Sequence, residues 1–176
     1  MTNKERNPEA RALLEKIVVN AGVGKASSSQ PNFEEKVLTQ IARDIAVISG
    51  QKPEIRRARR SIAGFKVREG QVVGLRITLR RRKMVDFLER LIRIVLPRVR
   101  DFAGVDPEAV DKGGVLNLGF REQFVFPEVD PEQSNFVFSL GVNLVPKRRN
   151  QAGALAAYEK LGIPFRKTAP AKGKKK

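Results

Sequence analysis

The residues from Val73 to Arg80 constrain the fold more than any other part of the sequence, because apolar side chains alternate there with small, polar or basic residues. The apolar positions are Val73, Leu75, Ile77 and Leu79, and the positions between them are Gly74, Arg76, Thr78 and Arg80. Successive side chains of a strand point to opposite faces. The pattern therefore predicts a strand with one face on a hydrophobic core and a basic face in water.

Further strands are expected where short apolar runs recur. They lie at residues 16–20, 115–120 and 136–145. The basic residues 52–67 are expected to form extended chain, and Glu69-Gly70 is typical of a turn. A loop is expected at residues 21–32, after the first strand.

Apolar residues at helical spacing predict helices over residues 33–48, 84–96 and 150–161. Asn32 and Glu35 fit a capping box at the start of the first helix, and Gly50 is expected to end it. Pro97 is expected to end the second helix, because proline cannot continue the backbone hydrogen bonding.

Because the strands are apolar on one face only, the fold class indicated is α+β, with an antiparallel or mixed sheet. The helices are expected to cover one face of this sheet and to leave the other for a ligand. Three regions are expected: a short polar segment at 1–14, a single domain at 15–167 and a basic disordered tail at 168–176. No apolar run approaches the roughly 20 residues of a membrane-spanning helix, so no membrane partner is expected.

The charge of the chain is concentrated rather than spread. The net charge is +16, and residues 52–83 carry twelve basic and two acidic residues, whereas the last eleven residues carry six basic and none acidic. The remaining basic and acidic residues balance. Positive charge gathered in this way attracts a polyanion and releases its counterions. The candidate RNA-binding residues on this ground are Arg56, Arg57, Arg59, Arg60, Arg76, Thr78 and Arg80.

The sequence argues against an enzyme. It has no Cys and no His, so thiol nucleophiles, histidine bases and most zinc sites are excluded, and neither a metal nor a cofactor is expected. Gly22-Val23-Gly24-Lys25 does not have the spacing of a phosphate-binding loop, and Ser27 stands where a dinucleotide fingerprint needs glycine. One alternative is a free-standing nucleic-acid enzyme or chaperone. Such an enzyme should place several carboxylates near the basic segment, which has only Glu54 and Glu69.

A DNA-binding regulator is the other alternative, and it should show a helix with clustered base-reading side chains, which the sequence lacks. The aromatic residues are ten Phe and one Tyr, and most Phe fall on expected core faces. Stacking on an aromatic platform is therefore not expected to dominate. Recognition of a folded RNA through its backbone and shape fits the sequence better.

Several segments together resemble a known family. They are EKIVVNAGVG at 15–24, a long stretch at 48–80 that contains GQKP and SIAGFK, FLERLIRIVLPRVRDFAGV at 87–105, LGFREQFVFPEVD at 118–130 and LGIPFRK at 161–167. In this order they resemble bacterial ribosomal protein five of the large subunit. The resemblance covers nearly the whole chain from residue 15.

The resemblance implies a structural protein of the large ribosomal subunit, in the cytoplasm. A member of this family binds 5S ribosomal RNA and anchors it in the central protuberance, in the neighbourhood of the 23S ribosomal RNA. It also contacts the transfer RNA in the peptidyl site, and it forms an intersubunit bridge with small-subunit ribosomal protein thirteen. No homo-oligomer is expected.

The resemblance also implies particular residues. The family's 5S-contacting positions correspond to Lys16, Asn20, Gln51, Thr78 and Arg80. Its transfer-RNA loop corresponds to residues 64–74, in which the implied contacts are Gly64, Phe65, Lys66, Val67, Arg68, Glu69, Gly70, Gln71 and Gly74. From the residues alone, an ordinary hairpin with a solvated tip is the alternative for this loop.

Overall fold

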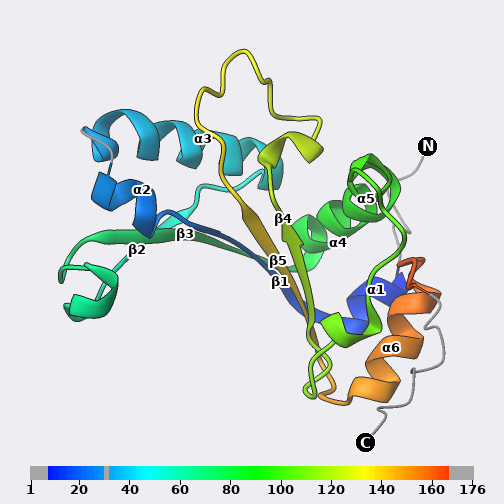
Figure 1. Cartoon of the computed structure of the whole chain (residues 1–176). Coiled ribbons are helices and arrows are strands. Elements are labelled where there is room, and N and C mark those ends of the chain that lie inside the picture. The colour runs from blue at the N-terminus through cyan, green and yellow to red at the C-terminus, as the bar shows by residue number, and fades with distance from the viewer. Residues whose placement is uncertain (1–7, 30–31, 167–176) are drawn as a thin grey trace, which may run out of the picture.

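The computed structural model describes residues 8–29 and 32–166. The expected tail at 168–176 lies outside the described residues, as do residues 1–7 of the expected N-terminal segment. The chain folds around a five-stranded sheet in the order β2-β3-β1-β5-β4, in which every neighbouring pair is antiparallel (Figure 1). The strands are β1 Leu14–Gly22, β2 Glu54–Arg57, β3 Val72–Leu79, β4 Leu116–Phe120 and β5 Leu140–Pro146. The α+β class is confirmed.

The helices lie between the strands in the chain. They are α1 Pro8–Leu13, α2 Gly24–Ser29, α3 Leu38–Ser49, α4 Arg81–Arg90, α5 Leu96–Arg98 and α6 Gln151–Lys160. Single π-helical turns at Phe33–Val37 and Leu91–Val95 precede α3 and join α4 to α5. Short 3₁₀ turns occur at Ala63–Phe65, Pro107–Ala109 and Gln123–Val125. None of the helices in the described ranges is long and apolar enough to cross a membrane.

The core lies between the sheet and the helices that cover it. From β3, Leu75, Ile77 and Leu79 are buried, and the apolar stripes of α3 and α4 are buried with them. The helical members of this core include Ile41, Ile45, Ile48, Met84, Phe87 and Leu88. Burial of this apolar surface supplies the main driving force for folding, and it leaves the opposite face of the sheet uncovered.

The prediction that Val73 belongs to the core face is wrong. Val72 is fully buried, whereas Val73 is only half-buried. Arg56 pairs with Gly74 and Arg57 pairs with Val72, so the register skips Val73. This extra residue is a β-bulge, which shifts the alternation by one position. The bulge keeps a core residue at the start of β3 while Gly74, Arg76 and Thr78 stay on the open face.

Two expectations around the first helix are also wrong. Asn32 makes no side-chain cap, because its backbone is left-handed (φ 55°) and the chain enters a π-helical turn, in which the Leu38 N–H bonds to the Phe33 carbonyl. The capping box with Glu35 therefore does not form. Within the expected loop, residues 24–29 are helical, and the Ser28 and Ser29 hydroxyls donate to carbonyls four residues back. Gly50 ends α3 in a left-handed conformation (φ 67°), as predicted.

The strand expected at 136–145 begins only at Leu140. The backbone N–H groups before Leu140 bond to side-chain amides and are therefore not available to a neighbouring strand. The Phe136 N–H donates to Gln40, and the Phe138 N–H donates to Gln123. Ser134, which donates to the buried carboxylate of Asp44 at 2.6 Å, belongs to the same network. These bonds tie the segment before β5 to α3, and no sequence period indicates them.

Candidate nucleic-acid interface

The open face of the sheet presents its side chains in rows, because paired residues of neighbouring strands point the same way. One row crosses all five strands. In the order β2-β3-β1-β5-β4 it consists of Glu54, Arg76, Asn20, Gly141 and Gly119. It places two candidate RNA-binding residues, Arg76 and Asn20, side by side at the centre of the face.

The next row lies two residues further along each strand. It consists of Thr78 on β3, Val18 on β1, Asn143 on β5 and Asn117 on β4. The Asn143 side chain donates to the Asn117 amide oxygen. Thr78 therefore lies on the same face as Arg76 and Asn20. The side-chain amides of Asn143 and Asn117 can donate hydrogen bonds to a nucleic acid and can accept them from it.

Lys16 and Arg80 meet at the end of this face. Both cations lie 3.3 Å from the same carboxylate oxygen of Glu15. The Lys16 ammonium, and then the Arg80 guanidinium, hold the pKa of the Glu15 carboxyl below its ordinary value. The structure therefore brings Lys16 and Asn20 of β1, Thr78 of β3 and Arg80, the residue after β3, onto one surface, although the two segments lie about 60 residues apart in the chain.

The arginines of the β2–β3 edge are held by carboxylates. Glu54 accepts from Arg56 at 2.8 Å and from Arg76 at 3.0 Å. Both pairs are at least 40% exposed, and exposed pairs contribute only about 0–1 kcal/mol to stability. A phosphate can therefore replace Glu54 as the partner of these guanidinium groups at small cost.

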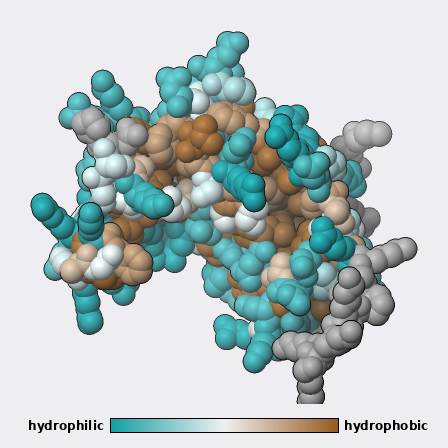
Figure 2. Space-filling model, in the orientation of Figure 1, coloured by the Kyte–Doolittle hydropathy of each residue, from teal (hydrophilic) through white to brown (hydrophobic). Residues whose placement is uncertain are grey.

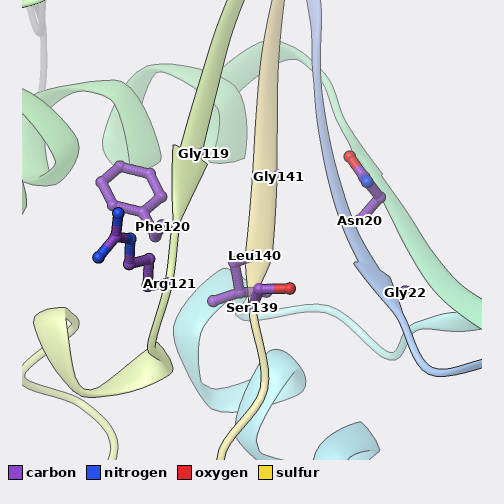
Figure 3. Close-up of a pocket in the computed structure, with 8 residues that line it drawn as sticks. All are labelled: Asn20, Gly22, Gly119, Phe120, Arg121, Ser139, Leu140 and Gly141. Atoms are coloured by element: carbon purple, nitrogen blue, oxygen red, sulfur yellow. The ribbon is translucent and has the colours of Figure 1, made fainter. Parts of the chain in front are cut away.

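Glycines line the bottom of a hollow on the open face and leave backbone exposed there. Gly22, Gly119 and Gly141 line a hollow of about 410 Å³ together with Asn20, Arg121 and Ser139 (Figure 3). A Cβ on Gly74 would lie 2.9 Å from the Ala21 carbonyl oxygen. A bare backbone lets another chain approach closely. Sequence reasoning missed Gly119 and Gly141 as parts of the site, although glycine inside an otherwise apolar strand is a signal for such an approach.

Other candidate residues lie elsewhere. Arg57 is on the opposite side of β2 from Arg56, and its guanidinium contacts Glu34 at 3.0 Å and the Gly70 carbonyl. Gln51 follows α3, where its backbone groups bond to the Ser49 hydroxyl. Arg59 and Arg60 are exposed and belong to the connection between β2 and β3. The sheet face therefore does not include these four residues.

The connection between β2 and β3, residues 58–71, is an arm that projects at one end of the sheet (Figure 1). Its base is fastened to α2, because Gln71 donates to the Ser28 hydroxyl at 2.7 Å. Only residues 54–57 of the expected extended segment are a strand; the arm contains a 3₁₀ turn and a bridge between Ile62 and Val67. Gly74, expected in the loop, instead pairs with Gly22 inside the sheet.

The tip of the arm is apolar and surrounded by cations. Phe65 is 78% exposed and Ile62 is 50% exposed, which makes Phe65 the most exposed large apolar residue of the described chain. Figure 2 shows this tip as a brown and white patch edged by hydrophilic side chains. The Lys66 and Arg68 side chains have no hydrogen-bond or ion-pair partner among the described residues. An aromatic ring beside free cations is suited to an RNA base and its phosphate.

Comparisons with known proteins cover nearly the whole chain. The sequence model of the family described as Ribosomal protein L5 matches residues 7–68, and the model of the C-terminus of the same ribosomal family matches residues 72–165. The chain is 47% identical to the large ribosomal subunit protein uL5 of Rubrobacter xylanophilus over 91% of its own length and 86% of the relative. It is 42% identical to uL5 of Thermus thermophilus, over 88% of its own length and 82% of the relative.

Proposed function

The chain belongs to the ribosomal protein L5 family of the large ribosomal subunit, and from this premise we propose that it anchors 5S ribosomal RNA on the open face of its sheet. The family is structural and non-enzymatic. Within the large subunit, the protein's task is then to hold an RNA in place. The binding surface consists of Lys16, Asn20, Arg76, Thr78 and Arg80 above the glycine floor.

The proposal rests on one observation: candidate residues of β1 and β3 lie on the same side of the sheet. Asn20 pairs directly with Arg76, Thr78 lies on the same side of β3, and Arg80, the residue after β3, contacts Glu15 of β1. Guanidinium groups bind phosphates through paired hydrogen bonds, and amide and hydroxyl groups can bond to sugars and bases. Four of the five positions that the family resemblance suggests, Lys16, Asn20, Thr78 and Arg80, therefore lie on one side of the sheet together with Arg76, which charge suggests.

The arm at residues 58–71 is proposed to contact the transfer RNA in the peptidyl site. Its fastened base and exposed tip support a role at a distance from the sheet, because a loop held by a rigid scaffold can reach a second partner. Lys66 and Arg68 would bind phosphates and Phe65 would stack on a base. The family resemblance also suggests an intersubunit bridge to small-subunit ribosomal protein thirteen, which we include in the proposal without assigning residues to it.

The RNA that co-purifies with the full chain tests the proposal. A tagged chain is expressed in a bacterium, the ribosomes are removed by centrifugation, and the free protein is washed at moderate salt before its bound RNA is sequenced. We expect 5S ribosomal RNA to be strongly enriched over transfer RNA and messenger RNA. Equal recovery of all RNA classes would show that the chain binds through charge alone, against the proposal.

A further inference from the structure

Beside the open face lies a second hollow, of about 670 Å³, between the end of α5 and the end of β4. Its walls include Arg98, Arg100, Asp101, Arg121 and Glu122, and Phe124 contributes an apolar surface. None of these residues was expected to belong to the site. A volume of this size falls in the range of small-molecule pockets.

The arginines of this hollow differ from those on the sheet. Arg56, Arg76 and Arg80 each have a carboxylate partner. By contrast, none of Arg98, Arg100 and Arg121 forms a hydrogen bond or an ion pair through its side chain with any described residue. All three are exposed. Their donors are therefore available to a ligand without first breaking an internal bond.

The second hollow is continuous with the floor of the open face. Gly119, Phe120 and Arg121 line both hollows, so the two meet along β4. Around Gly119 a Cβ would meet nothing within 4 Å, which leaves this passage open. In Figure 3, the Arg121 side chain extends on the far side of β4 from Asn20. A chain lying over Asn20 and Gly141 can thus pass over β4 and reach the three arginines.

From these observations we propose that the hollow is a second RNA-binding site, which takes a single-stranded ribonucleotide segment continuous with the RNA on the sheet. Its arginines bind the phosphates. Asp101 and Glu122, which form no ion pair with any described residue, accept hydrogen bonds from ribose 2′-hydroxyl or base amino groups. The side chains of an acidic peptide offer no donors for these two carboxylates, whereas each ribonucleotide carries a 2′-hydroxyl donor. The proposal rests on the function proposed for the open face.

The test uses the full chain and a bacterial 5S ribosomal RNA. The variant Arg98→Ala/Arg100→Ala/Arg121→Ala removes three exposed cations from the hollow, and Arg93→Ala/Lys112→Ala/Lys160→Ala removes three exposed cations outside it. Neither set contributes buried apolar side chains, and thermal melting checks that both variants stay folded. Affinity is measured by fluorescence anisotropy across a salt series.

We expect the first variant to bind 5S RNA about tenfold or more weakly, with a salt slope lower by about 2, because each lost phosphate contact removes roughly 0.7 from the slope for single strands. The control variant should change the affinity much less. Equal losses in the two variants would overturn the proposal. If the unmodified chain does not bind 5S RNA, the function proposed for the open face is wrong. If the unmodified chain binds and the two variants lose equal affinity, only the second site is wrong.

A second arm tests the ribose contacts. We expect Asp101→Ala/Glu122→Ala to reduce the preference of the chain for an RNA oligonucleotide over a 2′-deoxy oligonucleotide of the same sequence by threefold or more. A variant that binds both oligonucleotides more tightly by the same factor would show that the carboxylates only repel phosphate, and it would contradict the assigned ligand.

Discussion

Asn20 on β1 lies directly across from Gly141 on β5, and a Cβ on Gly141 would come within 2.9 Å of both terminal atoms of the Asn20 amide. The asparagine side chain therefore lies over the glycine. This position keeps the amide on the open face, next to Arg76 on the other neighbouring strand. Gly141 is part of the proposed binding surface because the absence of a side chain makes room for the Asn20 amide.

Gly141→Ala is expected to weaken 5S RNA binding about tenfold, because the methyl group displaces the Asn20 amide and one of its hydrogen bonds is worth on the order of 1 kcal/mol or more. Titration of labelled 5S RNA measures the effect, and circular dichroism should show an intact fold. Gly153→Ala in α6, where a Cβ makes only an ordinary contact at 3.5 Å, is the control. Unchanged RNA binding by Gly141→Ala would show that the Asn20 amide takes no part in RNA recognition.

Arg80 and its neighbour Leu79 are expected to affect different properties. The Arg80 side chain is 52% exposed, so Arg80→Ala should weaken RNA binding and leave the melting temperature nearly unchanged. Leu79 is fully buried, and Leu79→Ala should lower the free energy of unfolding by about 2–5 kcal/mol through the cavity that it leaves. Urea unfolding and RNA titration measure both variants. Collapse of the fold in Arg80→Ala would refute the assignment of the two faces.

The cations at the tip of the arm are expected to serve a partner other than 5S RNA. Lys66→Ala/Arg68→Ala should change the free energy of 5S binding by only a few tenths of a kcal/mol, because these side chains lie away from the rows of the sheet. The same variant, assembled into ribosomes, should crosslink less to the transfer RNA in the peptidyl site. A variant that loses 5S binding and keeps the crosslink contradicts the role proposed for the arm.

Tyr158 is expected to make stability depend on pH in the alkaline range. It is fully buried, and its hydroxyl lies 2.9 Å from the carbonyl oxygens of Gly114 and Leu144. Burial raises the pKa of this hydroxyl above its ordinary value. The folded protein therefore keeps a proton that the unfolded chain releases near pH 10, so its stabilising effect is complete below about pH 10 and declines above it.

Tyr158→Phe should lower the free energy of unfolding by roughly 1–3 kcal/mol at pH 7, since the buried carbonyls lose their donor. It should also reduce the further loss of stability between about pH 9 and 11. Urea unfolding at several pH values measures both effects, and comparison with the unmodified chain cancels the titration of surface lysines. Identical pH dependence in the two proteins would rule out this role of Tyr158.

Local periodicity was sufficient to predict much of the fold. The alternation of β3 from Gly74 onward, the stripe of α4 and the glycine after α3 each depend on a few adjacent residues, and the structure confirms them. The errors arise where a distant partner decides the local structure. The bulge at Val73 depends on pairing with β2, and the late start of β5 depends on side chains of Gln40 and Gln123.

The candidate site shows the same division. Arg76 and Thr78 share a face because they alternate on one strand, which the sequence displays directly, and Arg80 follows this strand. That Asn20 lies beside Arg76 and over Gly141 follows from the strand order, which places β1 between β3 and β5. The hollow that Arg98 and Arg121 share depends on contacts between segments far apart in the chain, and single-sequence patterns carry no signal for it.

Directed cleavage of 5S RNA tests the central claim, that RNA lies on the open face of the sheet, most directly. The chain has no natural cysteine, so one cysteine can carry an iron chelate that cuts nearby RNA. Asn117→Cys places it at the exposed edge of the open face, and Val47→Cys, 49% exposed on α3, places it on the helical side. We predict strong, localised cuts from position 117 and none above background from position 47. Cuts from position 47 alone would contradict the account.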